Sequence, residues 1–290
     1  MVVNRSEENG WLTPPASLDE QPAVPRDRST LLKRLVWIAG QILLILASFQ
    51  VYKTVRKFGI REDPQIAFDH AVDVINFQDS LGLFFEEGMQ RWALDRGEWY
   101  ILIFNNLYAY YTWWVVGGMM VLAFFAPERY RYIRRAFYIS MLLVTPMYLL
   151  YPLAPPRFMN EISGFGYNYD FVDTLAVWGP NYFSDTGMVQ GNRHAAMPSM
   201  HCGWTVFSAI AFSMVFKSPK VRIGIVAFFA ALILYIVIVT GNHYWIDGAV
   251  GWMFIATAFV INRYIHYPLI KRYLAGRGES SEQSAQQQAD

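Results

Sequence analysis

Residues 221–240 read VRIGIVAFFAALILYIVIVT, and Arg222 is the one charged residue in this stretch. An α-helix rises about 1.5 Å per residue, so about 20 apolar residues cross a hydrocarbon layer of about 30 Å. That layer offers no water to backbone polar groups, and a helix satisfies them internally. We therefore predict that this stretch is a membrane-spanning helix and that the fold is all-α.

Five more apolar stretches lie on either side of this one. The whole chain is 54% hydrophobic and 17% aromatic, which is high for a soluble protein. The sequence therefore predicts a polytopic membrane protein, a six-transmembrane-helix bundle that occupies residues 31–275 as one membrane domain. The polar ends, 1–30 and 276–290, are expected to be disordered cytoplasmic tails. The predicted spans are residues 31–51, 99–125, 136–153, 200–215, 221–240 and 245–265.

The distribution of Lys and Arg predicts the orientation of this bundle. Cytoplasmic loops carry an excess of these residues, and the loop between the fifth and sixth spans has none. We expect both termini to be cytoplasmic and the loops after the third and fifth spans to lie on the outer face. The connection between the first two spans, rich in both signs of charge, is a partial exception. The expected cytoplasmic cations are Arg129, Arg131, Arg134, Arg135, Lys217, Lys220, Arg222, Arg263, Lys271, Arg272 and Arg277.

That connection, residues 64–96, places apolar residues among acidic ones in a loosely helical rhythm. One interpretation is an interfacial amphipathic segment that shields a lipid entrance. The other is a pair of surface helices that pack on the bundle.

Charge and cysteine content exclude several classes of function. A net charge of +1 gives no basic surface for nucleic acid, so no nucleic-acid partner is expected. Cys202 is the only cysteine, which excludes an internal disulfide and cysteine-built zinc or iron–sulfur sites.

Three polar segments fall in the two loops predicted to face outward: residues 151–157 (YPLAPPR), 197–201 (MPSMH) and 240–247 (TGNHYWID). His243 and Asp247 are four residues apart, so at the start of a helix they share one face. A carboxylate that holds one imidazole nitrogen leaves the other nitrogen aimed for attack. This spacing predicts that His243 is a nucleophile oriented by Asp247.

The other two segments supply the remaining groups that phosphoryl transfer needs. His201, at the start of the fourth span, can protonate the leaving oxygen. Arg157 can bind two phosphoryl oxygens at once, and Ser199 with the backbone amides of the same helix start can add donors. Arg193 and His194 are further candidates for contacts to the phosphate or head group.

A metal site is the alternative interpretation of the same loop. His194 and His201 could act as ligands together with Asp170, Asp173 or Asp185. Their spacing matches no known metal motif, and a histidine nucleophile needs no metal. We therefore expect neither a metal nor another cofactor.

These residues resemble the phosphatidic acid phosphatase type 2 (PAP2) superfamily over the last four spans. Its Pro-Ser-Gly-His motif looks like residues 198–201, with Met200 in place of Gly, and its later His with an Asp four residues on looks like His243 and Asp247. The resemblance implies a six-span helical bundle with its site at the outer face, His201 as the general acid and His243 as the residue that becomes phosphohistidine.

Two departures from the superfamily pattern concern the phosphate-binding cations. The usual Lys seven residues before the motif Arg is Leu150 here, and the prolines precede rather than follow Arg157. The usual Ser-Arg pair before the nucleophile is Ile236 and Val237. The pattern is more similar to the inositol-phosphotransferase and sphingomyelin-synthase-like branch.

The expected activity is therefore a phosphotransferase or phosphatase that acts on a lipid phosphate or phospholipid within the membrane. The acceptor would be a hydroxyl of inositol, a sugar or a lipid, or water in a plain lipid or polyprenyl phosphate phosphatase. A rival from another class is a lipid transporter or scramblase that uses the same residues only to bind a head group. Such a protein would not need Asp247 behind His243.

Overall fold

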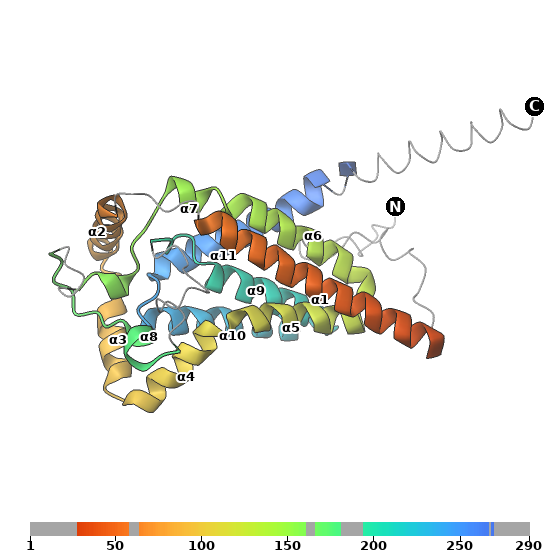
Figure 1. Cartoon of the computed structure of the whole chain (residues 1–290), viewed down its shortest axis with the longest axis horizontal. Helices are drawn as coiled ribbons and strands as arrows, with labels where there is room; N and C mark the ends of the chain where they lie inside the picture. The colour runs from red at the N-terminus through yellow and green to blue at the C-terminus, as the bar shows by residue number, and fades with distance from the viewer. Residues whose placement is uncertain (1–27, 58–63, 161–165, 181–193, 267, 270–290) are drawn as a thin grey trace, which may run out of the picture.

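The computed structural model describes residues 28–57, 64–160, 166–180, 194–266 and 268–269. These residues form helices, and an isolated parallel bridge joins Leu153 to Ala195. Figure 1 shows long helices that run side by side, with shorter helices gathered at one end. The elements are α1 (Arg28–Lys57), α2 (Gln65–Ser80), α3 (Glu86–Leu94), α4 (Glu98–Ala109), α5 (Tyr111–Phe125), α6 (Pro127–Val144), α7 (Met147–Leu150), the 3₁₀ turn η3 (Pro156–Phe158), α8 (Thr174–Trp178), α9 (Met200–Ser213), α10 (Pro219–Val239), α11 (Trp245–Ile261) and the π-helical turn η5 (Asn262–His266).

Several of these helices are long and apolar enough to cross a membrane, which makes the chain a multi-pass membrane protein. In the described residues four helices pass this test, and the bent pair α4–α5 would be a fifth. The four are Leu32–Val55, Arg129–Leu150, Pro219–Val239 and Trp245–Ile265. α9 covers the shortest predicted span but has 14 residues, fewer than a full crossing needs. The six-span count therefore stays a prediction.

The second and third predicted spans differ in detail from the structure. Residues 99–125 form two helices with a 55° bend at Tyr110 rather than one straight helix. Helix α6, which corresponds to the third predicted span, begins at Pro127 instead of near residue 136. The fixed φ of proline suits the first turn of a helix. The arginines at 129, 131, 134 and 135 therefore lie on α6 itself rather than in a loop, and residues 151–153 lie beyond its end.

Helix α9 is the centre of the bundle and packs against α5, α10 and α11. Most of its side chains are buried, as expected for a helix that is surrounded by other helices. Gly251 allows α11 to approach it closely, because a Cβ at this position would collide with the Ser199 carbonyl at the start of α9. The beginnings of α9 and α11 are thereby held together, and the Ser199 amide also donates to the Asp247 carbonyl at 2.9 Å.

The segment between α1 and α4 forms the two helices α2 and α3. α2 buries Phe68, Ala71 and Ile75 against the loop that follows α7, including Leu153. Packing on the bundle is thus one of its roles. Several large apolar side chains of this segment are exposed, and its position at a membrane interface stays a prediction. They are Phe77, Leu81, Leu83, Phe85 and Trp92.

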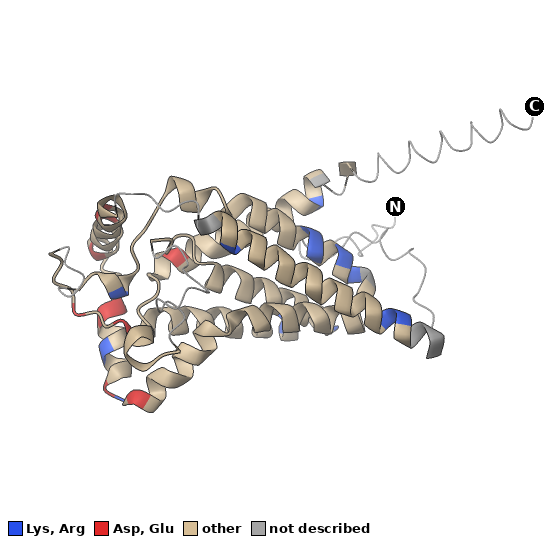
Figure 2. Cartoon of the chain, viewed as in Figure 1, with Lys and Arg blue, Asp and Glu red and all other residues tan. Residues whose placement is uncertain are grey.

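Charged residues are unevenly distributed along the bundle. Figure 2 shows Lys and Arg near the starts of α1 and α6, at one end, and acidic residues concentrated around α2 and α3, at the other. This asymmetry runs along the axis of the long helices, the direction that the positive-inside rule concerns.

Candidate active site

Two histidines meet at the end of the bundle where α9 and α11 begin. His243 Nε2 lies 3.4 Å from His201 Nδ1, although 42 residues separate them in the chain. His243 Nδ1 lies 3.3 Å from Asp247 Oδ2. The three side chains thus form a row in which one nitrogen of His243 faces a carboxylate and the other faces a second imidazole.

Asp247 is fixed by the first turn of α11. It is completely buried, and its Oδ2 also accepts the Tyr244 amide at 3.1 Å, which satisfies one of the amides left unpaired at a helix start. His243 precedes this helix instead of lying on it, so the helical spacing that suggested the pair is only partly realised. The carboxylate reaches back over the helix start to the ring.

Aromatic rings from the bent helix pair enclose His201. The Tyr108 ring stacks on it with a centroid distance of 4.0 Å and an interplanar angle of 20°. The Tyr111 ring lies 4.0 Å away at 51°. The bend at Tyr110 therefore allows the end of α4 and the start of α5 each to place a ring against the same imidazole.

Arg157 forms another part of the site and is 4% exposed. Its backbone amide donates to the Gly241 carbonyl at 2.9 Å, and its guanidinium donates to Asn242 Oδ1. Its Nε forms an ion pair with Asp173 at 3.4 Å. Gly241 has φ +68° and lies where a Cβ would approach the Gln90 side chain to 2.6 Å and the Val172 carbonyl to 3.2 Å, so glycine is required there.

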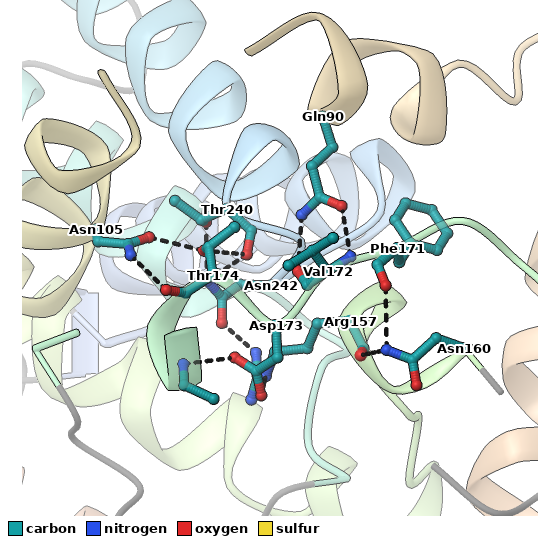
Figure 3. Close-up of polar contacts among 11 residues, drawn as sticks. Gln90, Asn105, Arg157, Asn160, Phe171, Val172, Asp173, Thr174, Thr240 and Asn242 are labelled. Carbon is teal, nitrogen blue, oxygen red and sulfur yellow. Dashed lines mark hydrogen bonds and ion pairs between the residues drawn. The ribbon is translucent and has the colours of Figure 1, made fainter. Parts of the chain in front are cut away.

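A hydrogen-bond network behind Arg157 connects four distant parts of the chain (Figure 3). Gln90 pairs with Val172 in both directions, at 3.0 and 2.9 Å. Asn105 donates to the Thr174 carbonyl at 2.8 Å, and the Thr174 hydroxyl donates to the Thr240 carbonyl at 3.0 Å. The network holds the Asp173 loop against the residues that precede His243.

Glu86 supports the site from the α3 side. This carboxylate is fully buried, and it accepts the Trp245 amide at 2.9 Å and the Gln78 side-chain amide at 2.5 Å. Burial raises the pKa of Glu86, and these donors oppose the shift. α3 is thereby tied to the first residue of α11.

A cavity of about 30 Å³ lies between these groups. That volume has room for about two water molecules among the side chains that line it. The lining combines four tyrosines with the two histidines and the arginine. It consists of Tyr52, Tyr108, Tyr111, Tyr148, Pro155, Arg157, Ala195, Ala196, Pro198, Met200, His201, Asn242 and His243.

The structure does not bring every predicted phosphate contact to this cavity. Ser199 is fully buried, and its hydroxyl accepts the Cys202 amide at 3.4 Å as the cap of α9. The ring of His194 lies against Phe68 and Phe158, and neither it nor Ser199 lines the cavity. Arg193 lies outside the described residues. The roles of these three residues stay predictions.

The acidic residues considered as metal ligands have arginine partners. Asp173 pairs with Arg157, and Asp170 lies 2.8 Å from Arg91. Within the described ranges no group of three His, Cys, Asp or Glu side chains is arranged to hold a metal ion, and Asp185 lies outside those ranges.

Several residues of the site could not be singled out from the sequence. Asn242 directly precedes the nucleophile candidate, and this adjacency was the one available signal. Asp173 was considered only as a metal ligand. Tyr108 and Tyr111 belong to an aromatic-rich span in which nothing local distinguishes them from other ring-bearing residues.

Comparison with known proteins identifies the family. No curated protein and no solved structure matches the chain significantly. A model of the PAP2 superfamily matches residues 72–261, a range of 190 of the 290 residues (261 minus 72 plus 1). The range contains every residue that lines the cavity except Tyr52. The chain therefore belongs to the PAP2 superfamily.

Proposed function

We propose that this protein is a membrane-embedded phosphotransferase that acts on a lipid phosphate or phospholipid through a phosphohistidine formed on His243. Members of the PAP2 superfamily are phosphatases and phosphotransferases that act on lipid phosphates in membranes. The observation that carries the proposal is the position of His243, with one nitrogen 3.3 Å from Asp247 and the other 3.4 Å from His201.

In the first step, His243 Nε2 attacks the phosphorus while Asp247 accepts a hydrogen bond from Nδ1–H. The bond between phosphorus and the leaving oxygen breaks, and His201 gives that oxygen a proton. Arg157 binds the non-bridging oxygens, on which negative charge gathers. Its partners Asn242 and Asp173 aim the guanidinium toward the cavity wall that His243 also lines.

In the second step, an acceptor hydroxyl attacks the phosphohistidine from the cavity side. His201, now neutral, takes the proton of that hydroxyl, and the bond between phosphorus and Nε2 breaks. A hydroxyl of inositol, a sugar or a lipid would give transfer of a phospho-head group, and water would give hydrolysis. The replacement of two usual phosphate-binding cations by Leu150 and Val237 favours transfer, as in the inositol-phosphotransferase-like branch.

We further infer that the bundle has six spans and that its active site faces outward. This orientation would place the cations near the starts of α1 and α6 and both termini in the cytoplasm. α9 would be the shortest span, surrounded by the other helices rather than by lipid. The chain outside residues 31–275 would form the cytoplasmic tails.

Purified protein incubated with a panel of lipid phosphates, and with phosphatidylinositol in the presence and absence of inositol, tests this function. The wild type is compared with His243→Ala and with the control His70→Ala, whose ring stacks on Tyr151. A new phosphorylated acceptor made by the wild type and the control indicates a transferase, and free phosphate indicates a phosphatase. Equal activity of all three proteins would exclude the histidine mechanism.

A further inference from the structure

A second pocket, of about 240 Å³, lies between α5, α9 and α10. Its walls are mostly apolar, and helices α5 and α10 belong to the candidate membrane spans. The residues that line it are Trp114, Gly117, Gly118, Val121, Thr205, Ser208, Ala209, Phe212 and Phe229.

This pocket continues the face of α9 that carries His201. Thr205, Ser208 and Phe212 follow His201 by four, seven and eleven residues, and side chains at such spacings lie along one side of a helix. At about 1.5 Å per residue, the pocket extends from about 6 to about 17 Å below the histidine. On α5, Trp114 and Gly118 follow Tyr111, which lines the cavity of the candidate active site, by three and seven residues.

The upper end of the pocket contains a polar atom in an apolar setting. Thr205 is 1% exposed, and its hydroxyl has no hydrogen-bond partner among the described residues. A buried hydroxyl without a partner costs free energy, and a polar group of a ligand can relieve that cost. Lower in the pocket, Phe212 and Phe229 offer only carbon surface.

We propose that this pocket binds the hydrocarbon chain of the lipid whose phosphate is attacked by His243 at the start of α9. The inference rests on the proposed function, because that function places the phosphate at the top of α9. A phosphate at His201 directs an attached chain along the same helix face, first past Thr205 and then past Phe212. A hydroxyl, ester or amide next to the phosphate would meet the Thr205 hydroxyl.

Gly117 permits a substitution that fills the pocket. A Cβ at Gly117 would have no atom within 4 Å, whereas a Cβ at Gly118 would collide with Ser208. Gly117→Phe therefore introduces a ring at the pocket from a position where the Cβ has open space. Gly224→Phe is the matched control, because Gly224 also has open space around its Cβ, lies on α10 and does not line the pocket.

The experiment uses a lipid phosphate with a photoreactive group in the middle of its chain and a second lipid of the same chain that ends in an alcohol. Both are added to the His243→Ala variant, in which turnover is blocked, and the labelled residues are identified by mass spectrometry. We expect the phosphate lipid to label α5, α9 or α10 at this pocket. We expect Gly117→Phe to reduce that label roughly tenfold, the equivalent of about two buried methylene groups, and Gly224→Phe to leave it unchanged.

Two results would overturn the inference: equal labelling by the alcohol, which would mean that bulk lipid fills the pocket, or labelling that Gly117→Phe does not reduce. Labelling of the pocket does not depend on catalysis. If the pocket is labelled but the wild type turns over no lipid phosphate, the proposed function fails while the binding site stands. If the wild type is active but the pocket is not labelled, the proposed function stands and the binding site is wrong.

Discussion

The two histidines of the candidate site are held in opposite ways. His243 is surrounded by polar groups: Asp247 faces its Nδ1, and Asn242 next to it binds Arg157. His201 lies against the rings of Tyr108 and Tyr111, which come from the bent pair of helices.

The difference matches the two tasks that we propose. A carboxylate fixes which imidazole nitrogen carries the proton, which a nucleophile requires. An aromatic ring stacked on an imidazole attracts the cationic form through its π-electrons and leaves both ring nitrogens open to other partners. This environment suits a group that acts as general acid in the first step and as general base in the second. The polar half of this comparison is the surroundings of His243, and the aromatic half is the surroundings of His201. Each half can be tested separately.

The largest effect is expected from the carboxylate behind the nucleophile. Asp247→Asn should lower kcat about 10⁴-fold, because the amide can hold the ring in the wrong tautomer, as for orienting carboxylates in other enzymes. The measurement is turnover of the substrate that the panel identifies. A lipid carrier would be almost unaffected by this substitution, so transport activity that survives in Asp247→Asn would contradict the enzymatic function.

A substitution of Arg157 tests the polar half without changing His243 itself. Arg157→Lys keeps the charge but loses the planar fork that binds two oxygens, and we expect kcat to fall about 10²- to 10³-fold. Arg91→Lys is the control, since Arg91 is a surface residue paired with Glu87 and Asp170. Turnover that falls equally in both variants would show that the loss does not come from phosphate binding.

The sequence predicts the parts of this site that local spacing encodes. His243 and Asp247 are near neighbours, and a helix start brings them together. The helices likewise follow from long apolar stretches, and every predicted span contains a helix. The boundaries were less predictable, since the arginines after residue 127 extend α6 instead of forming a loop.

Contacts between distant segments left no pattern in the sequence. Asp173 reaches Arg157 because the network around Gln90 and Thr174 shapes its loop, and the two residues are 16 positions apart with no helical or strand spacing between them. Tyr108 meets His201 only because the second predicted span bends at Tyr110. Such contacts depend on how the helices pack, which a periodic pattern does not specify.

A smaller effect is expected in the aromatic half. Tyr108→Leu removes the ring stacked on His201, and we expect kcat to fall about 10-fold, a value within the range for a partly desolvated cation–π contact. Tyr108→Phe keeps the ring and should retain most of the activity. The kinetic comparison of these two variants separates the ring from the hydroxyl. If both lose activity equally, the hydroxyl carries the effect and the aromatic half of the comparison fails.

The smallest effect concerns Glu86, the buried carboxylate of the polar half. Its pKa is raised chiefly by burial, so the stability contributed by its neutral form is fully present below the ordinary pKa of about 4.5 and is lost as the pH rises through the raised value. Between pH 4.5 and 7 the wild type should therefore lose Tm relative to Glu86→Gln, by on the order of 2 to 4 °C. Thermal unfolding in detergent, followed by circular dichroism, measures this difference.

Glu87→Gln is the matched control, because Glu87 is a partly exposed neighbour paired with Arg91, and its substitution should leave the pH dependence of Tm unchanged. Parallel Tm curves for the wild type and Glu86→Gln would mean that the Trp245 and Gln78 donors offset the cost of burying the charge.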